Sequence, residues 1–485
     1  MTARTIAVKS GFVWTSDIAP THTVMNGNRI TALPVDWNID LPFLLHIARI
    51  RQLRSMEFTG DKLMKNPILG TLLLTIIVVT FTPASVHSLP ESAEDVVLQW
   101  NRVLGQTLEV PELHPGNILP ARSFAMINLA IFDAMNSIEG GYRSYLTDVP
   151  GSKNASQKAA AAQAAHDVLV GLYPSRQAVY EAELADSFSG ESFNRVRQGQ
   201  IVGRIVAARL LAYRSNDGWT APWTPYQLDP MPGNWQGPTP FPGFAVFTNI
   251  PGVCPFALSS PTQFLPVAPP ALTGAEYASS LYEVKELGSA SSGTRTAEQT
   301  ASAFRWAIPP ASDAAMFSVV FSTSITQDLS SLERARVAAL SFVSFHDALL
   351  TTFTSQYTYG RWRPVTAIQR ADEDGNDNTT ADVGWDSLLG GPGTPPHPSY
   401  ASNASSASAS IAKTLELFYG SDNVAFQIDF GPEGVRQYSS FSTLTDEVAK
   451  SRIYGGVHFR YDTTAGQKAG RDVATYVAEN LMTRR

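Results

Sequence analysis

The chain has 485 residues, of which 44% are hydrophobic and only 16% are charged, against roughly 25% charged residues in an average soluble domain. A net charge of −7 argues against a nucleic-acid partner, because such domains need a basic surface. The single cysteine, Cys254, excludes an intrachain disulfide framework and a cysteine-rich zinc site. A mean hydropathy of −0.07, with one strongly apolar run, argues against a polytopic membrane protein.

The strongly apolar run covers residues 68–81, about 14 residues, whereas a membrane-spanning helix needs roughly 20. Lys65 precedes the run, and Val86 and Ser88 follow it at the spacing of a signal-peptidase site. We therefore expect residues 64–88 to be a secretory signal peptide.

A signal peptide normally begins a protein, so this one lies at an unusual position. We interpret residues 1–63 as a spurious or cytoplasmic extension and Met64, or alternatively Met56, as the natural start. The alternative is a signal anchor, in which basic residues such as Arg49 and Arg51 hold the cytoplasmic side. If the signal is cleaved, no stable membrane span remains, and the working domain is residues 89–485.

Three Asn-x-Ser/Thr triplets, at Asn154, Asn378 and Asn403, fit passage through the secretory pathway. We therefore expect a glycoprotein that is secreted or resident in the lumen of that pathway. With one cysteine, its stability must come from its core rather than from cross-links.

Apolar residues at helical spacing dominate the chain beyond Glu91. They predict helices at residues 121–138, 158–172, 198–214, 297–307, 332–354, 404–419, 443–452 and 464–482. The helix at 332–354 is apolar on every side, which predicts a central, buried position. Gly420 is the expected C-cap of the helix at 404–419. Because alternating strand patterns are scarce, the predicted fold class is all-α.

Residues 216–270 interrupt the helical pattern with prolines, glycines and aromatic side chains. So long an irregular stretch in a compact protein is usually functional or a packed cover. Two interpretations stay open: a surface wrap with its own small core, or the wall of a substrate channel.

Phosphate-loop, dinucleotide-binding, zinc-protease and nucleophile-elbow motifs are absent from the sequence. The first segment with the residues for an oxyanion site instead runs from Gln356 to Pro364, where Arg363 directly precedes a helix-initiating proline. The alternative for this segment is a surface arginine stacked on Trp362.

The second segment covers residues 394–405 and delivers Ser402 and Asn403 to the start of the predicted helix at 404–419. Free backbone N–H groups and the positive end of the helix dipole make such a start an anion site. The alternative is that Ser402 only caps the helix.

The third segment runs from Ser451-Arg452 to Asp462 and contains His458. Arg452 and His458 would face different sides of a continuous helix, but Gly455-Gly456 breaks the helix and can bring them together. The four-residue spacing of His458 and Asp462 lets a carboxylate hold the imidazole Nδ1–H and keep Nε2 nucleophilic.

These segments resemble a known family. Arg363-Pro364, the Ser402 segment and the stretch from Ser451-Arg452 to His458 look like the three-part signature of the vanadium-dependent haloperoxidases and type 2 phosphatidic acid phosphatases (PAP2). The likeness extends to residues 255–258, 295–300, 362–368, 372–375, 395–398 and 451–459, which are similar to the haloperoxidase-like branch. It covers roughly residues 92–480, with the motifs concentrated in 332–480.

The resemblance implies a pair of helical bundles with vanadate or phosphate between core helices. It matches His458 to the histidine that bonds vanadate, Arg363, Arg452 and Ser402 to the groups that neutralise its oxygens, and Asn403 to a backbone N–H donor. The implied reactants are hydrogen peroxide, a halide and a small organic acceptor. In the phosphatases the matching histidine attacks phosphorus instead.

Two positions depart from the family pattern. Gln356 stands where the family has a lysine, and Ala404 stands where it has an acid/base histidine. His397 lies five residues before Ser402, but its Pro-Pro-His-Pro setting recurs in family members that keep the usual histidine.

Three functions follow for the chain. The leading hypothesis is a vanadium haloperoxidase-like protein with weakened activity. The alternatives are an acid phosphatase with His458 as nucleophile, and a non-catalytic secreted protein that binds an oxyanion. The sequence leaves the halide, the organic acceptor and the oligomeric state open.

Overall fold

The computed structural model divides the chain into two compact units, Met1–Ser92 and Ala93–Arg485. It describes residues 22–26, 29–33, 95–110, 113, 119–150, 153–188, 190–237, 245–307, 311–322, 328–390, 394–430 and 434–485. In the first unit these include one antiparallel hairpin, formed by β1 (His22–Asn26) and β2 (Arg29–Leu33). The predicted signal peptide at 64–88 lies outside the described residues, so secretion stays a prediction.

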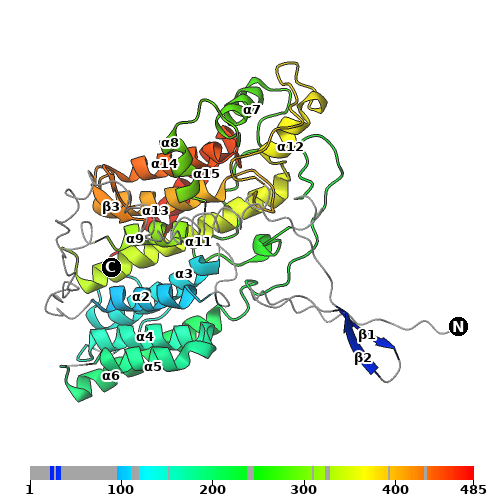
Figure 1. The fold of residues 1–485 in the computed structure, drawn as a ribbon. Helices are drawn as coiled ribbons and strands as arrows, with labels where there is room; N and C mark the ends of the chain where they lie inside the picture. Colours follow the sequence, from blue (N-terminus) through cyan, green and yellow to red (C-terminus); the bar gives the residue numbers. More distant parts are fainter. Residues whose placement is uncertain are drawn as a thin grey trace, which may run out of the picture. The chain divides into compact units, whose positions relative to one another are not determined.

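Helices dominate the second unit, which confirms the all-α prediction (Figure 1). Its described α-helices are α2 (Val96–Leu108), α3 (Leu119–Glu139), α4 (Gln157–Leu172), α5 (Gln177–Asp186), α6 (Phe193–Tyr213), α7 (Ala275–Leu287), α8 (Ala297–Arg305), α9 (Ala311–Val320), α11 (Ser331–Tyr359), α12 (Pro364–Gln369), α13 (Asn403–Tyr419), α14 (Phe441–Tyr454) and α15 (Arg460–Asn480). Short 3₁₀ turns at Pro174–Arg176, Ile250–Gly252 and Ala371–Glu373 join some of them. A small antiparallel hairpin of β3 (Phe426–Asp429) and β4 (Val435–Tyr438) pairs Phe426 with Tyr438.

Helix α11 lies between two groups of helices. It packs against α3 on one side, and α3 packs in turn on α4 and α6. On the other side it packs against α13 and α15, which contact α14. Figure 1 shows this order, with the cyan to green helices on one side of α11 and the orange and red helices on the other.

The ends of α11 are fixed by local interactions. At its start, the Ser330 hydroxyl accepts from the Glu333 N–H while the Glu333 carboxylate accepts from the Ser330 N–H, a capping box. At its end, Gly360 adopts a left-handed conformation with φ of 59°, which glycine tolerates without steric cost. Within the described chain, α11 is the one helix long and apolar enough to cross a membrane, but the window that meets this test is wholly buried inside the protein. The predicted central helix is therefore confirmed.

All eight predicted helices are present, most with ends shifted by a few residues. Gly420 caps α13 with φ of 71°, as expected. Helices α2, α5, α7, α9 and α12 and the β3–β4 hairpin were not predicted. All five of these helices have 13 residues or fewer, and so short an apolar pattern does not stand out from the sequence around it.

The irregular stretch at 216–270 serves as a packed cover. Trp235, Phe247 and Phe256 are buried, and Phe247 and Phe256 join the main core cluster. The end of the stretch, from Gln263 to Pro270, also lines a cavity of about 520 Å³ together with Tyr400 and Tyr461. The interpretation as a packed cover is therefore confirmed for this part of the stretch, while the wall of a substrate channel stays a prediction.

Glycines in α15 let its backbone approach α13. A Cβ on Gly466 would lie 2.3 Å from the carbonyl oxygen of Ser402, and one on Gly470 would lie 2.2 Å from that of Ser406. Real Cβ atoms do not come so close to a backbone oxygen. The close contact between α15 and α13 therefore includes Ser402, the N-cap residue of α13.

We predict that Gly466→Ala destabilises the protein by about 1–3 kcal/mol, because overpacking forces the two helices apart. Gly105→Ala in α2 is the matched control: its Cβ meets nothing within 4 Å, and a helical Gly→Ala change there should stabilise by about 0.4–1 kcal/mol. Urea unfolding measures both. Equal stability of Gly466→Ala and the wild type would contradict the proposed close contact.

Candidate functional site

The three segments selected from the sequence meet in the structure. Arg363, from the first, lies with its Nη1 atom 3.1 Å from Nε2 of His458, from the third. Ser402, from the second, donates its backbone N–H to the carbonyl of Asp462 at 3.0 Å. Residues that are up to 99 positions apart in the chain therefore form one buried cluster, which we call the candidate site.

His458 is held by Asp462 as the spacing predicted. Its Nδ1 lies 3.0 Å from Oδ2 of Asp462, and both side chains are buried. The same oxygen also accepts the Ser399 hydroxyl at 2.5 Å and the Phe459 N–H at 3.1 Å. Since the arginine N–H beside Nε2 can only donate, Nε2 accepts from Arg363 with its lone pair and Nδ1 carries the proton.

The helix break before His458 is also present. Helix α14 ends at Tyr454, Gly455 is its C-cap, and Gly456 has φ of 74°. A Cβ on Gly456 would lie 2.5 Å from the carbonyl of Gly288. The break turns the chain so that His458 faces Arg363 at the start of α15.

Arg363 is a buried guanidinium between two imidazoles. Its Nη1 approaches His458 Nε2, and its Nη2 lies 3.0 Å from Nδ1 of His397. Its Nε donates to the His397 carbonyl at 2.9 Å, and Nη1 also donates to the Val457 carbonyl at 2.8 Å. Arg363 is 2% exposed and Trp362 is fully buried, so the alternative of a surface arginine stacked on Trp362 is wrong.

Arg452 is the second buried guanidinium. It lies in the last turn of α14, and its Nη1 donates to the Trp306 carbonyl at 3.0 Å. Its Nε is buried and has no hydrogen-bond partner among the described residues. Within the same described ranges, no carboxylate lies within ion-pair distance of Arg363 or Arg452. The two cations thus have no ion-pair partner among the described residues, and the Asp462 carboxylate, which is bonded to His458, acts on Arg363 from a longer distance.

Burial controls the ionisation of the site. It lowers the pKa of Arg363 to about 9 and that of Arg452 to about 10, and Arg452 also lowers the former. Burial, followed by the charges of the two arginines, holds the pKa of His458 well below its ordinary value. Burial raises the pKa of Asp462 to about 7, although the hydrogen bond from Ser399 acts to lower it. His458 is therefore a neutral imidazole at neutral pH.

Ser402 caps α13, as its alternative interpretation predicted. Its Oγ accepts from the Ser405 N–H at 3.4 Å and from the Ser405 hydroxyl at 3.0 Å. Both bonds use the oxygen as acceptor, so the Ser402 hydrogen remains available to an anion. The Asn403 side chain accepts from the Ala404 N–H at 2.9 Å. Capping and anion binding are thus compatible roles for Ser402.

The structure shows the surroundings of Gln356 and Ala404, the two residues that depart from the family pattern. Gln356 is buried in the last turn of α11 and donates its Nε2 to the Ala401 carbonyl at 2.8 Å, while its Oε1 has no partner among the described residues. A neutral amide bound in this way supplies no charge to an oxyanion. Ala404 is half-buried in the first turn of α13 and offers no proton donor.

His397 and Ser399 also belong to the site. His397 was considered from the sequence and not selected as a replacement for the missing histidine, and Ser399 was not considered. His397 is buried, and its ring packs against Phe353 with centroids 5.1 Å apart. Since arginine only donates, His397 Nδ1 accepts from Arg363 and the ring is neutral. No spacing signal links Ser399 to Asp462, because the two lie 63 residues apart.

The residues present fit an oxyanion. A tetrahedral anion needs donors and positive charge, and the site has two guanidiniums without an ion-pair partner, the Arg452 Nε–H without an acceptor among the described residues, and the Ser402 hydroxyl. The lone pair of His458 Nε2 can bond the central atom of vanadate or phosphate. Such a ligand would replace the Arg363–His458 contact and accept from the guanidinium instead.

The buried cations and the neutral histidine lie among the helices of one helical-bundle unit. Residues 336–484 match the family described as the VCPO second helical-bundle domain. Over the rest of the helical unit, the likeness to known proteins is one of fold. No curated protein sequence matches the chain.

Solved structures of bacterial vanadium haloperoxidases share the fold. The structure described as the first bacterial vanadium-dependent iodoperoxidase has a TM-score of 0.64 at 24% identity, covering 80% of this chain and 95% of that one. A bacterial vanadium-dependent chloroperoxidase gives a TM-score of 0.60 in its holo form and 0.58 in its apo form, both at 16% identity. These matches cover 79% and 75% of this chain, and 96% and 92% of the chloroperoxidase chains.

We predict that Arg452→Met unfolds no more easily than the wild type when no oxyanion is present, because it removes a buried charge that lacks a carboxylate. Phosphate at about 100 times its Kd should stabilise the wild type by about 2.7 kcal/mol and the variant far less. Urea unfolding with and without phosphate gives both numbers. An equal gain from phosphate in the two proteins would contradict an anion site at Arg452.

Proposed function

We propose that the candidate site binds vanadate at His458 and oxidises halide with hydrogen peroxide, at a lower rate than a site with the full family pattern. The observation that supports this proposal is the convergence of two buried guanidiniums, without a carboxylate among the described residues, on a region that also holds the His458 Nε2 lone pair. The chemistry supplied by bound vanadate is the activation of peroxide for attack by a halide ion.

Each residue of the chain has a distinct task in this proposal. His458 bonds the oxyanion through Nε2, and Asp462 keeps the proton on Nδ1. Arg363 and Arg452 would neutralise the charge on the oxyanion's oxygens, and the Ser402 hydroxyl and the Asn403 backbone N–H would donate to them. A ligand would have to replace the Arg363–His458 contact. The other groups are fixed before a ligand arrives, so their reorganisation is small.

The two departures affect binding and turnover to different extents. Replacing a lysine by Gln356 removes one charge-assisted contact, which is worth about 1.5–3 kcal/mol, or about ten- to a hundredfold in affinity. Replacing a general acid/base by Ala404 commonly costs about 10²–10⁴ in rate. Oxyanion binding should therefore persist better than turnover.

A phosphatase remains the second candidate, because the same geometry prepares His458 as a nucleophile. Its Nδ1–H is held by Asp462, so attack on phosphorus would leave a stabilised imidazolium. The absent histidine at Ala404 would have protonated the leaving group. Hydrolysis of activated aryl phosphates, whose leaving groups need no proton, distinguishes this function from halide oxidation.

We predict that the protein with vanadate, hydrogen peroxide and bromide or iodide halogenates a phenolic dye, and that His458→Ala abolishes this activity. The variant loses the atom that bonds the oxyanion but leaves both guanidiniums in place. Dye absorbance measures the rate. Halogenation that survives in His458→Ala would contradict the assigned role of this histidine.

We further predict that Gln356→Lys with Ala404→His raises the halogenation rate by about 10²-fold or more, because the pair restores a cation and an acid/base group. Circular dichroism serves as the folding control. If the wild type shows no turnover while the double variant does, the natural protein is the non-catalytic oxyanion-binding form. If neither shows turnover, the missing groups do not account for the low activity.

A further inference from the structure

We infer that Glu447 is a positioning residue for Arg452 and acts through Trp306. The inference rests on the oxyanion binding proposed above, but not on turnover. Glu447 does not touch His458 or Arg363 in any contact among the described residues. Its effect on the site must therefore pass through intervening groups, and the structure provides one such path.

The first step of the path is the contact between Arg452 and Trp306. The Trp306 carbonyl is the acceptor of the Arg452 Nη1–H at 3.0 Å, and no other acceptor of this guanidinium occurs among the described residues. Trp306 is the C-cap of α8, so its carbonyl belongs to the last turn, where the helix dipole places partial negative charge. The direction of the Arg452 guanidinium thus depends on where this helix end lies.

The second step fixes that helix end. The Trp306 indole donates Nε1–H to Oε1 of Glu447 at 3.1 Å, and the ring is 5% exposed. The ring also packs edge-on against Phe430, with centroids 5.3 Å apart. One hydrogen bond therefore joins the residue that holds Arg452 to a carboxylate on α14.

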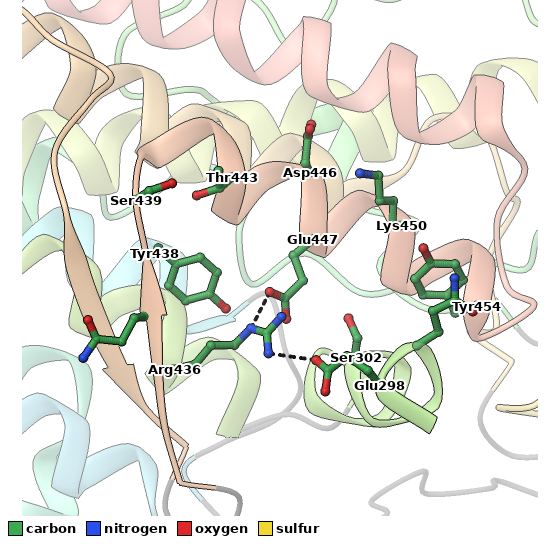
Figure 2. Close-up of a pocket in the computed structure, with 12 residues that line it drawn as sticks. Glu298, Ser302, Arg436, Tyr438, Ser439, Thr443, Asp446, Glu447, Lys450 and Tyr454 are labelled. Carbon is green, nitrogen blue, oxygen red and sulfur yellow. Dashed lines mark hydrogen bonds and ion pairs between the residues drawn. The ribbon is translucent and has the colours of Figure 1, made fainter. Parts of the chain in front are cut away.

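The third step is the anchoring of Glu447 itself. Its carboxylate accepts from Arg305 Nη1 at 2.9 Å and from Arg436 Nε at 2.6 Å, in addition to the indole. Its side chain is only 12% exposed, so these charge-assisted bonds are stronger than those of a surface pair. Figure 2 shows the carboxylate beside Arg436 in a pocket of about 490 Å³. The carboxylate thus joins the end of α8 to β4 and α14.

The residue at the start of the path and the residue it positions belong to the same helix. Glu447 and Arg452 both lie in α14, five residues apart, which corresponds to about 7.5 Å along the axis. Because the helix keeps this spacing, fixing Trp306 against Glu447 also fixes the Trp306 carbonyl relative to Arg452. Without the indole bond, the carbonyl and the guanidinium can both turn away from the oxyanion.

Glu298 supplies a matched control. Its Oε1 accepts from Arg436 at 2.8 Å and lies 3.4 Å from Arg305 Nη1, so it shares both cationic partners of Glu447. Its side chain is 60% exposed, and no contact with Trp306 is present in the described part of the chain. Figure 2 shows Glu298 on the opposite side of Arg436 from Glu447. Loss of Glu298 weakens the ion-pair network without removing the indole acceptor.

The experiment measures the Kd of vanadate and of inorganic phosphate by calorimetry in the full chain. We expect Glu447→Gln and Trp306→Phe each to weaken binding by about 10- to 100-fold, the range for residues that orient a ligand group. Trp306→Phe keeps an aromatic ring at this position and leaves the Glu447 carboxylate with Arg305 and Arg436. This variant therefore remains informative if Glu447→Gln fails to fold. Glu298→Gln should bind within about twofold of the wild type.

A double-mutant cycle separates positioning from general loss of stability. In an Arg452→Met background, Glu447→Gln should cause no further loss of affinity, because the group it positions is gone. Wild-type affinity in Trp306→Phe, an equal loss in Glu298→Gln, or an undiminished loss in the Arg452→Met background would each overturn the inference. Absence of binding by the wild type would overturn the proposed function as well, so the two failures are distinguishable.

Discussion

The structure of the site depends on two buried guanidinium groups without a carboxylate counter-ion in the described part of the chain. Removing a cation from water costs several kcal/mol unless an anion compensates it. Arg363 compensates in part by donating to two backbone carbonyls and two imidazoles, and Arg452 donates to one carbonyl. In the proposed function, a bound oxyanion would relieve this remaining unfavourable energy, so the energetic cost of burying the two cations would contribute to the affinity for the ligand.

The rest of the helical unit keeps these cations fixed. Arg363 directly precedes α12, Arg452 lies in the last turn of α14, and His458 lies just before α15. Three helix ends therefore meet at one place. The close packing of α15 on α13 at Gly466 sets the position of Ser402 relative to Asp462. Because each group lies on a rigid element, its direction is set by helix packing rather than by a flexible loop.

Much of this could be predicted from the sequence. The uniform apolar character of residues 332–354 indicated the central helix, and the four-residue spacing predicted the His458–Asp462 bond, since both signals are local. Three contacts could not be predicted. Ser399 bonds Asp462 across 63 residues, His397 accepts from Arg363, and Trp306 offers Arg452 a backbone carbonyl. A carbonyl has no side-chain identity, and long-range pairing depends on tertiary packing, so neither leaves a pattern in the sequence.

The most direct test of an oxyanion site at His458 is a crystal structure of the protein soaked with vanadate. The account predicts one tetrahedral or five-coordinate density bonded to His458 Nε2, with Arg363 and Arg452 within hydrogen-bond distance of its oxygens and Ser402 donating to one of them. Vanadate bound elsewhere, or a site in which Arg363 keeps its contact with His458 at saturating vanadate, would contradict it.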